Sequence, residues 1–205
     1  MRAVLLDYGM GNLRSVAKAL ETVGFTVKLA RSAEEAKNAP VLVLPGVGAF
    51  GDAMNNLKKT GLDRVIVNHL EAGRPFLGIC LGLQLLFEKS YEHGTHRGLG
   101  LLRGEVTLLP PTVRVPHIGW NQLWFKKPSP YLNGLKEGSF VYFVHSYRVE
   151  PKDEEVVLTV TDYGEPFVSA VSYDNLLAVQ FHPEKSQKVG LKILKNFYLE
   201  ALKRV

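Results

Sequence analysis

The most informative segment of the sequence is Phe76-Leu77-Gly78-Ile79-Cys80-Leu81-Gly82-Leu83-Gln84-Leu85-Leu86-Phe87. It runs from an apolar strand through Gly-x-Cys-x-Gly into an apolar helix, which is the pattern of a nucleophile elbow with cysteine in place of serine. The glycines let strand and helix approach closely, and the sharp turn pushes Cys80 outward at the carboxyl end of a sheet. Open α/β sheets bind their ligands at that end.

The sequence around this elbow alternates strand and helix patterns. Such alternation predicts parallel strands joined by crossover helices. The predicted strands are residues 3–6, 26–29, 41–44 and 75–79, and the predicted helices are 12–23, one that starts at Ser32, 62–72 and 81–88.

Beyond Glu105 the pattern changes to short β runs separated by turn residues, which predicts antiparallel strands added to the parallel core. The chain ends in a helical pattern that places Leu191, Leu194, Tyr198 and Leu202 on one face. The expected fold is therefore α/β, with a mostly parallel sheet flanked by helices and antiparallel strands in the C-terminal half. The β runs are residues 106–109, 140–144, 156–161, 167–172 and 176–181.

Composition limits the possible functions. With 205 residues, 46% hydrophobic and 22% charged, we expect residues 1–205 to form a single globular domain. The net charge is +5, but Lys and Arg are scattered among acids, so no nucleic-acid surface is predicted. An acid at position 7 and the absence of long apolar runs argue against a signal peptide or a membrane span. We expect a cytoplasmic protein.

The single cysteine, Cys80, cannot form an internal disulfide. Its predicted place at a helix N-terminus favours the thiolate, because unpaired amide groups there carry a partial positive charge. A free cysteine packed as a small hydrophobic residue is the alternative interpretation.

A second segment, Val179-Gln180-Phe181-His182-Pro183-Glu184, closes a predicted strand. Residues two apart on an extended chain point the same way, so His182 and Glu184 can both face the elbow. Pro183 lacks a donor and ends the strand. Glu184 can then hold the imidazole while His182 serves as the base for the thiol, as in a generalised triad. A surface pair is the alternative.

A third segment, Val41-Leu42-Val43-Leu44-Pro45-Gly46-Val47-Gly48-Ala49-Phe50, is a buried strand that opens into a glycine-rich loop. The loop can present a backbone amide, that of Val47, to an oxyanion, and the amide of Leu81 can supply the second donor. An ordinary tight turn is the alternative. The loop is neither a Walker loop nor a dinucleotide fingerprint, and the sequence calls for no metal or cofactor.

At these residues the sequence resembles the class I, or triad, glutamine amidotransferases, a flavodoxin-like family. More narrowly, it is similar to the branch formed by the glutaminase subunits of imidazole glycerol phosphate synthase, from histidine biosynthesis. The matching stretches are residues 7–12, 45–50, 78–82, 116–121, 142–147 and 180–186.

The resemblance implies that Cys80 attacks the glutamine side-chain amide, that a γ-glutamyl thioester forms, and that ammonia and then glutamate leave. The residues it implies for holding glutamine are Gly48, Gln84, Glu92, Ser146 and Tyr147. It also implies a partner, a (β/α)8-barrel cyclase that receives the ammonia and forms imidazole glycerol phosphate and aminoimidazole carboxamide ribotide. The residues expected at that interface are Asn12, Trp120, Tyr142 and Lys185.

Four further alternatives stay open at this point. The chain can belong to another synthase of the class, for anthranilate, aminodeoxychorismate or guanylate. It can also be a catalytically silent module on the same fold, because fold alone does not establish function. Trp120 and Tyr142 can be core aromatics, and Lys185 a solvated cation.

Overall fold

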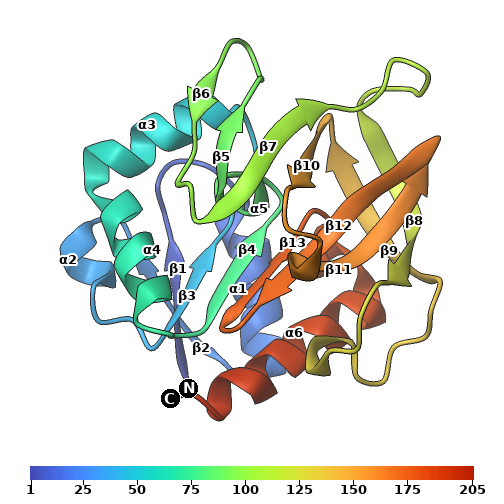
Figure 1. Ribbon diagram of the computed structural model, residues 1–205. Helices are drawn as coiled ribbons and strands as arrows, with labels where there is room; N and C mark the ends of the chain where they lie inside the picture. The colour runs from blue at the N-terminus through green and yellow to red at the C-terminus, as the bar shows by residue number, and fades with distance from the viewer.

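A computed structural model of residues 1–205 shows an α/β fold built on a thirteen-stranded sheet (Figure 1). Along the main path the strand order is β2-β1-β3-β4-β13-β12-β10-β7-β5-β6, and β11, β8 and β9 branch from β12. The strands are β1 (Arg2–Leu6), β2 (Thr26–Ala30), β3 (Val41–Leu44), β4 (Phe76–Ile79), β5 (Phe87–Ser90), β6 (His96–Arg97), β7 (Leu102–Leu108), β8 (His117–Phe125), β9 (Ser139–His145), β10 (Tyr147–Pro151), β11 (Val157–Tyr163), β12 (Glu165–Tyr173) and β13 (Leu176–Val179).

In the spatial order given above, the five neighbouring strands β2, β1, β3, β4 and β13 are parallel to one another. From β12 onward the strands pair antiparallel, apart from a parallel β5–β7 pair. This confirms the predicted class, a mostly parallel α/β sheet with antiparallel strands added late in the chain. The α-helices are α1 (Leu13–Val23), α2 (Ala33–Ala36), α3 (Phe50–Thr60), α4 (Leu62–Glu71), α5 (Leu81–Gln84) and α6 (Gln187–Leu202), and the 3-10 helices are Pro130–Leu132, Glu154–Val156 and Pro183–Lys185.

Two hydrophobic layers cover the parallel part of the sheet. Alternate residues of β1 show the division, because Val4 and Leu6 belong to one layer and Ala3 and Leu5 to the other. The first layer contains side chains of α2, α3 and α4, and the second contains side chains of α1 and α6. Strands β3, β4 and β13 are therefore buried on both faces, as a sheet covered on both sides requires, whereas the edge strand β2 is mostly exposed.

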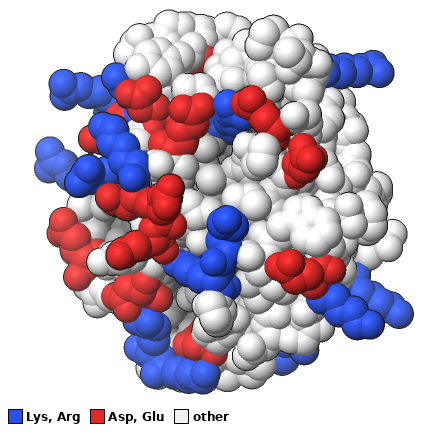
Figure 2. Space-filling model, turned by 45° about the vertical axis from the view of Figure 1, so that its right-hand side comes forward, with Lys and Arg blue, Asp and Glu red and all other residues white.

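Charged side chains are interspersed on the surface. On the face shown in Figure 2, Lys and Arg lie among Asp and Glu, and charged side chains are sparser on the right-hand part of this face than on the left. None of the helices combines the length and the apolar character that a membrane span needs.

The helix predicted over residues 81–88 is correct as far as Gln84 and wrong beyond it. Helix α5 ends at Gln84, and Phe87–Ser90 forms β5, which pairs with β7 from Leu102 onward. A short apolar run fits a buried helix and a buried strand equally well. The backbone partners in β7 decide between them, and β7 itself begins four residues before the run predicted at Val106.

Other boundaries also differ. Helix α3 and strands β8 and β10 were not predicted, and β13 ends at Val179 rather than at Phe181. In α6 the buried side chains include Ile193, Leu194, Phe197 and Ala201, whereas Leu202 is 46% exposed. The predicted face of α6 is thus rotated by about one residue, because both sets of positions follow helical spacing.

Candidate active site

Cys80 lies at the turn between β4 and α5 with φ 54° and ψ −110°. A positive φ is rare for a residue with a side chain, and such backbone strain is kept where the surrounding structure holds it in place. The Cys80 amide is anchored to the Val179 carbonyl oxygen at 2.7 Å. A Cβ at Gly82 would lie 2.0 Å from the Leu44 carbonyl oxygen, so only glycine fits where the elbow crosses β3. The structure thus contains the predicted sharp turn between strand and helix, with Cys80 at its tip.

His182 and Glu184 lie just after β13, and β13 is the neighbour of β4. His182 Nδ1 is 2.8 Å from Glu184 Oε1, and both side chains are buried. The expected reason for this pairing was wrong, because Pro183–Lys185 is a 3-10 helix rather than extended chain. The turn brings the carboxylate back toward the ring. A surface pair is excluded by the burial.

The electrostatics of His182 follow from its neighbours. Burial lowers the pKa of His182, but the Cys80 thiolate and the Glu184 carboxylate outweigh it and raise that pKa to about 10. With Nδ1 held by Glu184, the other ring nitrogen, Nε2, is buried without a hydrogen-bond partner. At neutral pH the ring is therefore a cation whose free nitrogen is available for proton transfer.

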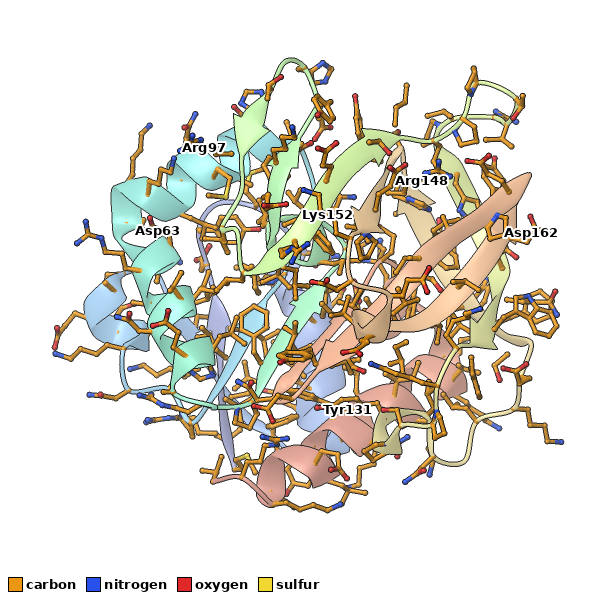
Figure 3. All side chains as sticks on the ribbon, in the orientation of Figure 1. Asp63, Arg97, Tyr131, Arg148, Lys152 and Asp162 are labelled. Atoms are coloured by element: carbon orange, nitrogen blue, oxygen red, sulfur yellow. The ribbon has the colours of Figure 1, made fainter.

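The elbow opens into a cavity of about 300 Å³. Its wall contains Cys80 and every residue expected to hold glutamine, together with Val47 and Leu81 of the predicted oxyanion hole. The lining residues are Val47, Gly48, Cys80, Leu81, Gln84, Glu92, Pro116, Val144, His145, Ser146 and Tyr147. A wider groove of about 670 Å³ beside Arg148, which Figure 3 labels, contains none of the predicted site residues.

Two polar side chains in the cavity wall are held by backbone groups. Gln84 donates from Nε2 to the Tyr147 carbonyl oxygen at 3.1 Å. Glu92 Oε2 accepts the Phe50 amide proton at 2.8 Å. Phe50 is the first residue of α3, and the preceding Ala49 gives no side-chain cap. Glu92 therefore caps this helix while its carboxylate faces the cavity.

The two expected oxyanion donors are not both free. The Leu81 amide donates to the Gly46 carbonyl oxygen at 3.3 Å. Gly46 is packed closely, because a Cβ there would lie 2.5 Å from Tyr8 Oη, and that hydroxyl donates to the Pro45 carbonyl oxygen. Val47 is 44% exposed. In this conformation the Leu81 amide is already hydrogen-bonded to the Gly46 carbonyl oxygen, so it is not available to an oxyanion.

The sequence analysis missed three groups near the sulfur. Gln180 Nε2 lies 3.6 Å from Cys80 Sγ, the Val144 carbonyl oxygen lies 3.9 Å from the same atom, and His145 lines the cavity. A polar residue between the apolar Val179 and Phe181 was the available signal for Gln180. The backbone carbonyl of Val144 has no signal in sequence.

The four expected interface residues are at least partly exposed. Asn12 caps α1 by accepting the Ser15 amide proton, and Lys185 is exposed in the 3-10 helix that follows His182. Trp120 and Tyr142 face each other across β8 and β9, with ring centroids 6.0 Å apart. Trp120 is 46% exposed, so the core-aromatic alternative is wrong for this residue.

Comparison with known proteins identifies the family. The family model described as glutamine amidotransferase class-I matches residues 4–201. A relative from Aquifex aeolicus (strain VF5), named imidazole glycerol phosphate synthase subunit HisH, is 70% identical over 204 residues and covers 99% of each chain. The chain is a class I glutamine amidotransferase of the HisH family.

A second HisH subunit, from Caldanaerobacter subterraneus subsp. tengcongensis, is 53% identical over 193 residues, which cover 94% of this chain and 95% of the relative. Solved structures share the fold at lower identity. PurLQS from Thermotoga maritima has a TM-score of 0.76 at 20% identity, covering 99% of this chain and 98% of that one. A glutamine amidotransferase crystal structure gives 0.75 at 22% identity, with coverage of 97% and 98%.

Proposed function

We propose that this class I amidotransferase is the glutaminase subunit of an imidazole glycerol phosphate synthase, with Cys80 as nucleophile and His182 and Glu184 as its partners. The observation that carries the proposal is the strained elbow at Cys80 in one cavity wall beside a buried His182–Glu184 pair. The HisH relatives at 70% and 53% identity support the choice of this synthase over the anthranilate, aminodeoxychorismate and guanylate branches.

In the first half of the reaction, the Cys80 thiolate attacks the carboxamide carbon of glutamine and forms a carbon–sulfur bond. The tetrahedral intermediate collapses when the carbon–nitrogen bond breaks. The raised pKa of His182 makes it the acid that protonates the leaving nitrogen, so that ammonia departs. Glu184 keeps the ring oriented through Nδ1 and stabilises its charge.

In the second half, His182 is neutral and takes a proton from water, which attacks the thioester carbon. The carbon–sulfur bond then breaks, glutamate leaves, and the Cys80 thiolate and the His182 cation are restored. Each half needs an oxyanion site for the tetrahedral oxygen, which we assign to the Val47 and Leu81 amides.

The cavity wall supplies recognition of the rest of glutamine. We assign Glu92 to the substrate ammonium group, because its carboxylate is the only acidic side chain among the lining residues. Gln84, Gly48 and the Ser146–Tyr147 backbone offer donors and acceptors for the remaining polar atoms. A cavity of about 300 Å³ is at the small end of ligand sites, which suits one amino acid.

The relatives are named as subunits, and we propose that this chain also works with a second one, a (β/α)8-barrel cyclase that consumes the ammonia. The exposed Trp120–Tyr142 pair supports a docking face at β8 and β9. Asn12 and Lys185 are assigned to the same face. A biosynthetic pair of this kind would act in the cytoplasm.

Replacing Cys80 tests the catalytic assignment. Cys80→Ala and Cys80→Ser should abolish glutamate release from glutamine, since neither residue supplies a thiolate, and both should keep the wild-type circular dichroism spectrum. Substantial hydrolysis by either folded variant would refute the assignment. Supplying the wild-type chain with the cyclase or with the acceptor proteins of the other synthases, and measuring ammonia transfer, tests the choice of synthase.

A further inference from the structure

Gln180 is a fully buried side chain wedged between the nucleophile and the cavity wall. Its Nε2 donates toward Cys80 Sγ at 3.6 Å, and its Oε1 accepts a proton from Gln84 Nε2 at 3.1 Å. Both ends of this buried amide therefore have a hydrogen-bond partner. Gln180 is thus the side-chain donor that contacts the sulfur.

The direction of this amide is fixed by its neighbours. Gln84 Nε2 also donates to the Tyr147 carbonyl oxygen at 3.1 Å. A carbonyl oxygen can only accept, so the NH2 group of Gln84 must face Tyr147 and its second proton must go to Gln180 Oε1. The NH2 group of Gln180 then faces the sulfur. Reversing the Gln180 amide would place its NH2 group against that of Gln84, and reversing the Gln84 amide would place its oxygen against the Tyr147 carbonyl oxygen.

A longer chain of contacts holds the Tyr147 carbonyl in place. The Tyr147 carbonyl oxygen also accepts a hydrogen bond from His145 Nδ1 at 2.9 Å. Because the proton of the neutral His145 ring is on Nδ1, its Nε2 must accept the hydrogen bond from His117 Nδ1, which is also 2.9 Å long. Asn121 donates to His117 Nε2 at 3.4 Å and to the Asp162 carbonyl oxygen at 2.8 Å, near the outer end of β11 (Figure 3). Each ring nitrogen of His117 and His145 can therefore act in only one way, as a donor or as an acceptor, that suits its partner.

We propose that Gln180 is a positioning residue for the nucleophile: its amide holds the Cys80 sulfur in place and favours the thiolate by donating to it. The hydrogen bonds from Gln84 and Tyr147 fix the polarity of that amide. The inference rests on the proposed role of Cys80 as nucleophile. It adds an uncharged donor, which acts on the sulfur independently of His182.

The arrangement explains why a buried amide, and not an acid or an apolar residue, follows Val179. An acid at position 180 would place a second negative charge against the thiolate, and an apolar side chain would leave the Gln84 proton and the sulfur without their contacts. Tyr8 and His182 are the titratable groups whose charges interact with Cys80. Glu92 and His145 line the same cavity, and Glu184 holds the His182 ring. Substitutions at Gln180 leave all five residues in the chain.

The pH dependence of Cys80 alkylation tests the proposal. The chain has one cysteine, so the rate of modification by iodoacetamide reports on Cys80 alone and requires no glutamine. Gln180→Met removes the hydrogen-bond donor while keeping a similar side-chain volume, and it should raise the midpoint of the rate-against-pH profile by about one pH unit. Below the midpoint, such a shift corresponds to a thiolate fraction about tenfold lower than in the wild type. Gln180→Glu should raise it further.

Gln122→Met is the matched control, because Gln122 is partly buried and donates instead to the Gly138 carbonyl oxygen; its midpoint should equal that of the wild type. An unchanged midpoint in folded Gln180→Met would overturn the proposal. If that variant fails to fold, Gln180→Glu decides, and an unchanged midpoint there has the same meaning. Failure of the proposed function is a separate result, since it would appear as glutamine hydrolysis by Cys80→Ala.

Discussion

His182 lies where two electrostatic effects oppose each other. Burial disfavours its cationic form, whereas the Cys80 thiolate and the Glu184 carboxylate favour it, and the two anions prevail to give a pKa of about 10. At neutral pH the imidazole ring of His182 is therefore protonated. In the proposed mechanism, this protonated ring gives its proton to the leaving nitrogen.

His182 and Glu184 should differ in the size of their mutational effects. We expect His182→Ala to lower kcat by about a hundredfold to ten-thousandfold, because the proton donor and acceptor is lost. Glu184→Ala should cost less, since Glu184 only orients the ring and stabilises its charge. Steady-state glutaminase assays with both variants measure this. Equal losses, or a larger loss at Glu184, would reverse the assigned roles.

The sequence predicted much of the candidate site, and its failures have physical causes. Cys80, His182 and Glu184 could be proposed from the sequence because their motifs combine rare side chains with fixed spacing. The pairing of His182 and Glu184 was predicted for the wrong reason, since the turn after His182 is a 3-10 helix. The occupied Leu81 amide could not be predicted, because it depends on a backbone carbonyl in a distant loop.

At the level of elements, the parallel half was the more predictable one. Strands β1, β3 and β4 are buried on both faces and appear as short apolar runs between helical patterns. The antiparallel half mixes buried and exposed positions, as in β8, where only His117 and Leu123 are buried. β8 was therefore missed, and the β5 segment was assigned to a helix.

The crossing of α5 over β3 depends on Gly82. A Cβ at this position would lie 2.0 Å from the Leu44 carbonyl oxygen, and a backbone atom cannot move aside as a side chain can. Gly82→Ala should lower the free energy of unfolding by about 3 kcal/mol. The control is Gly73→Ala, where no atom lies within 4 Å but φ is +70°, so only about 1 kcal/mol is expected. Urea unfolding followed by circular dichroism measures both, and equal losses would contradict the steric explanation.

The β8–β9 hairpin holds two buried histidines that should make the protein sensitive to acid. Burial lowers the pKa of His117 to about 4 and that of His145 to about 3. Because both values lie below the unfolded value of about 6.5, their contribution to stability is complete above pH 6.5 and is lost as pH falls toward 4 and 3. At pH 5 the loss is about 2 kcal/mol for each histidine.

The variant that tests this is His117→Asn, whose amide can still donate to His145. Its unfolding free energy should fall less between pH 7 and pH 5 than that of the wild type. His93→Asn is the control, because His93 is exposed and has a positive φ that asparagine tolerates. A pH dependence unchanged by His117→Asn would show that His117 does not titrate on unfolding as argued.

On the scale of the whole molecule, the strand order brings the functional segments together. Strands β3, β4 and β13 are neighbours in the sheet, so the glycine-rich loop, the elbow and the His182 turn follow the same edge although they are up to 140 residues apart in sequence. The β8–β9 hairpin extends from this edge and exposes Trp120. A partner docked on the hairpin would lie next to the cavity.

One peptide unit is suited to couple such a partner to the chemistry. The Gly46 carbonyl oxygen accepts the Leu81 proton in the isolated chain. Rotation of the Gly46–Val47 peptide would remove that oxygen, free the Leu81 amide and turn the Val47 amide toward the same place. A single flip would therefore convert a blocked oxyanion site into one with both donors.

We accordingly expect the isolated chain to hydrolyse glutamine slowly and a ligand-loaded cyclase to accelerate it by at least about a hundredfold to a thousandfold, since one oxyanion donor provides that range and the flip supplies two. Gly48 has φ +112°, and a Cβ there would lie 2.7 Å from Met10 Cε, so Gly48→Val should hinder rearrangement of the loop and reduce the acceleration. Steady-state rates with and without the cyclase and its ligand measure both effects. A control titration must show that Gly48→Val still binds glutamine and the cyclase. If the isolated wild-type chain already turned over at the rate of the complex, the peptide could not be the gate, and the Leu81–Gly46 hydrogen bond would have to break without any help from a partner.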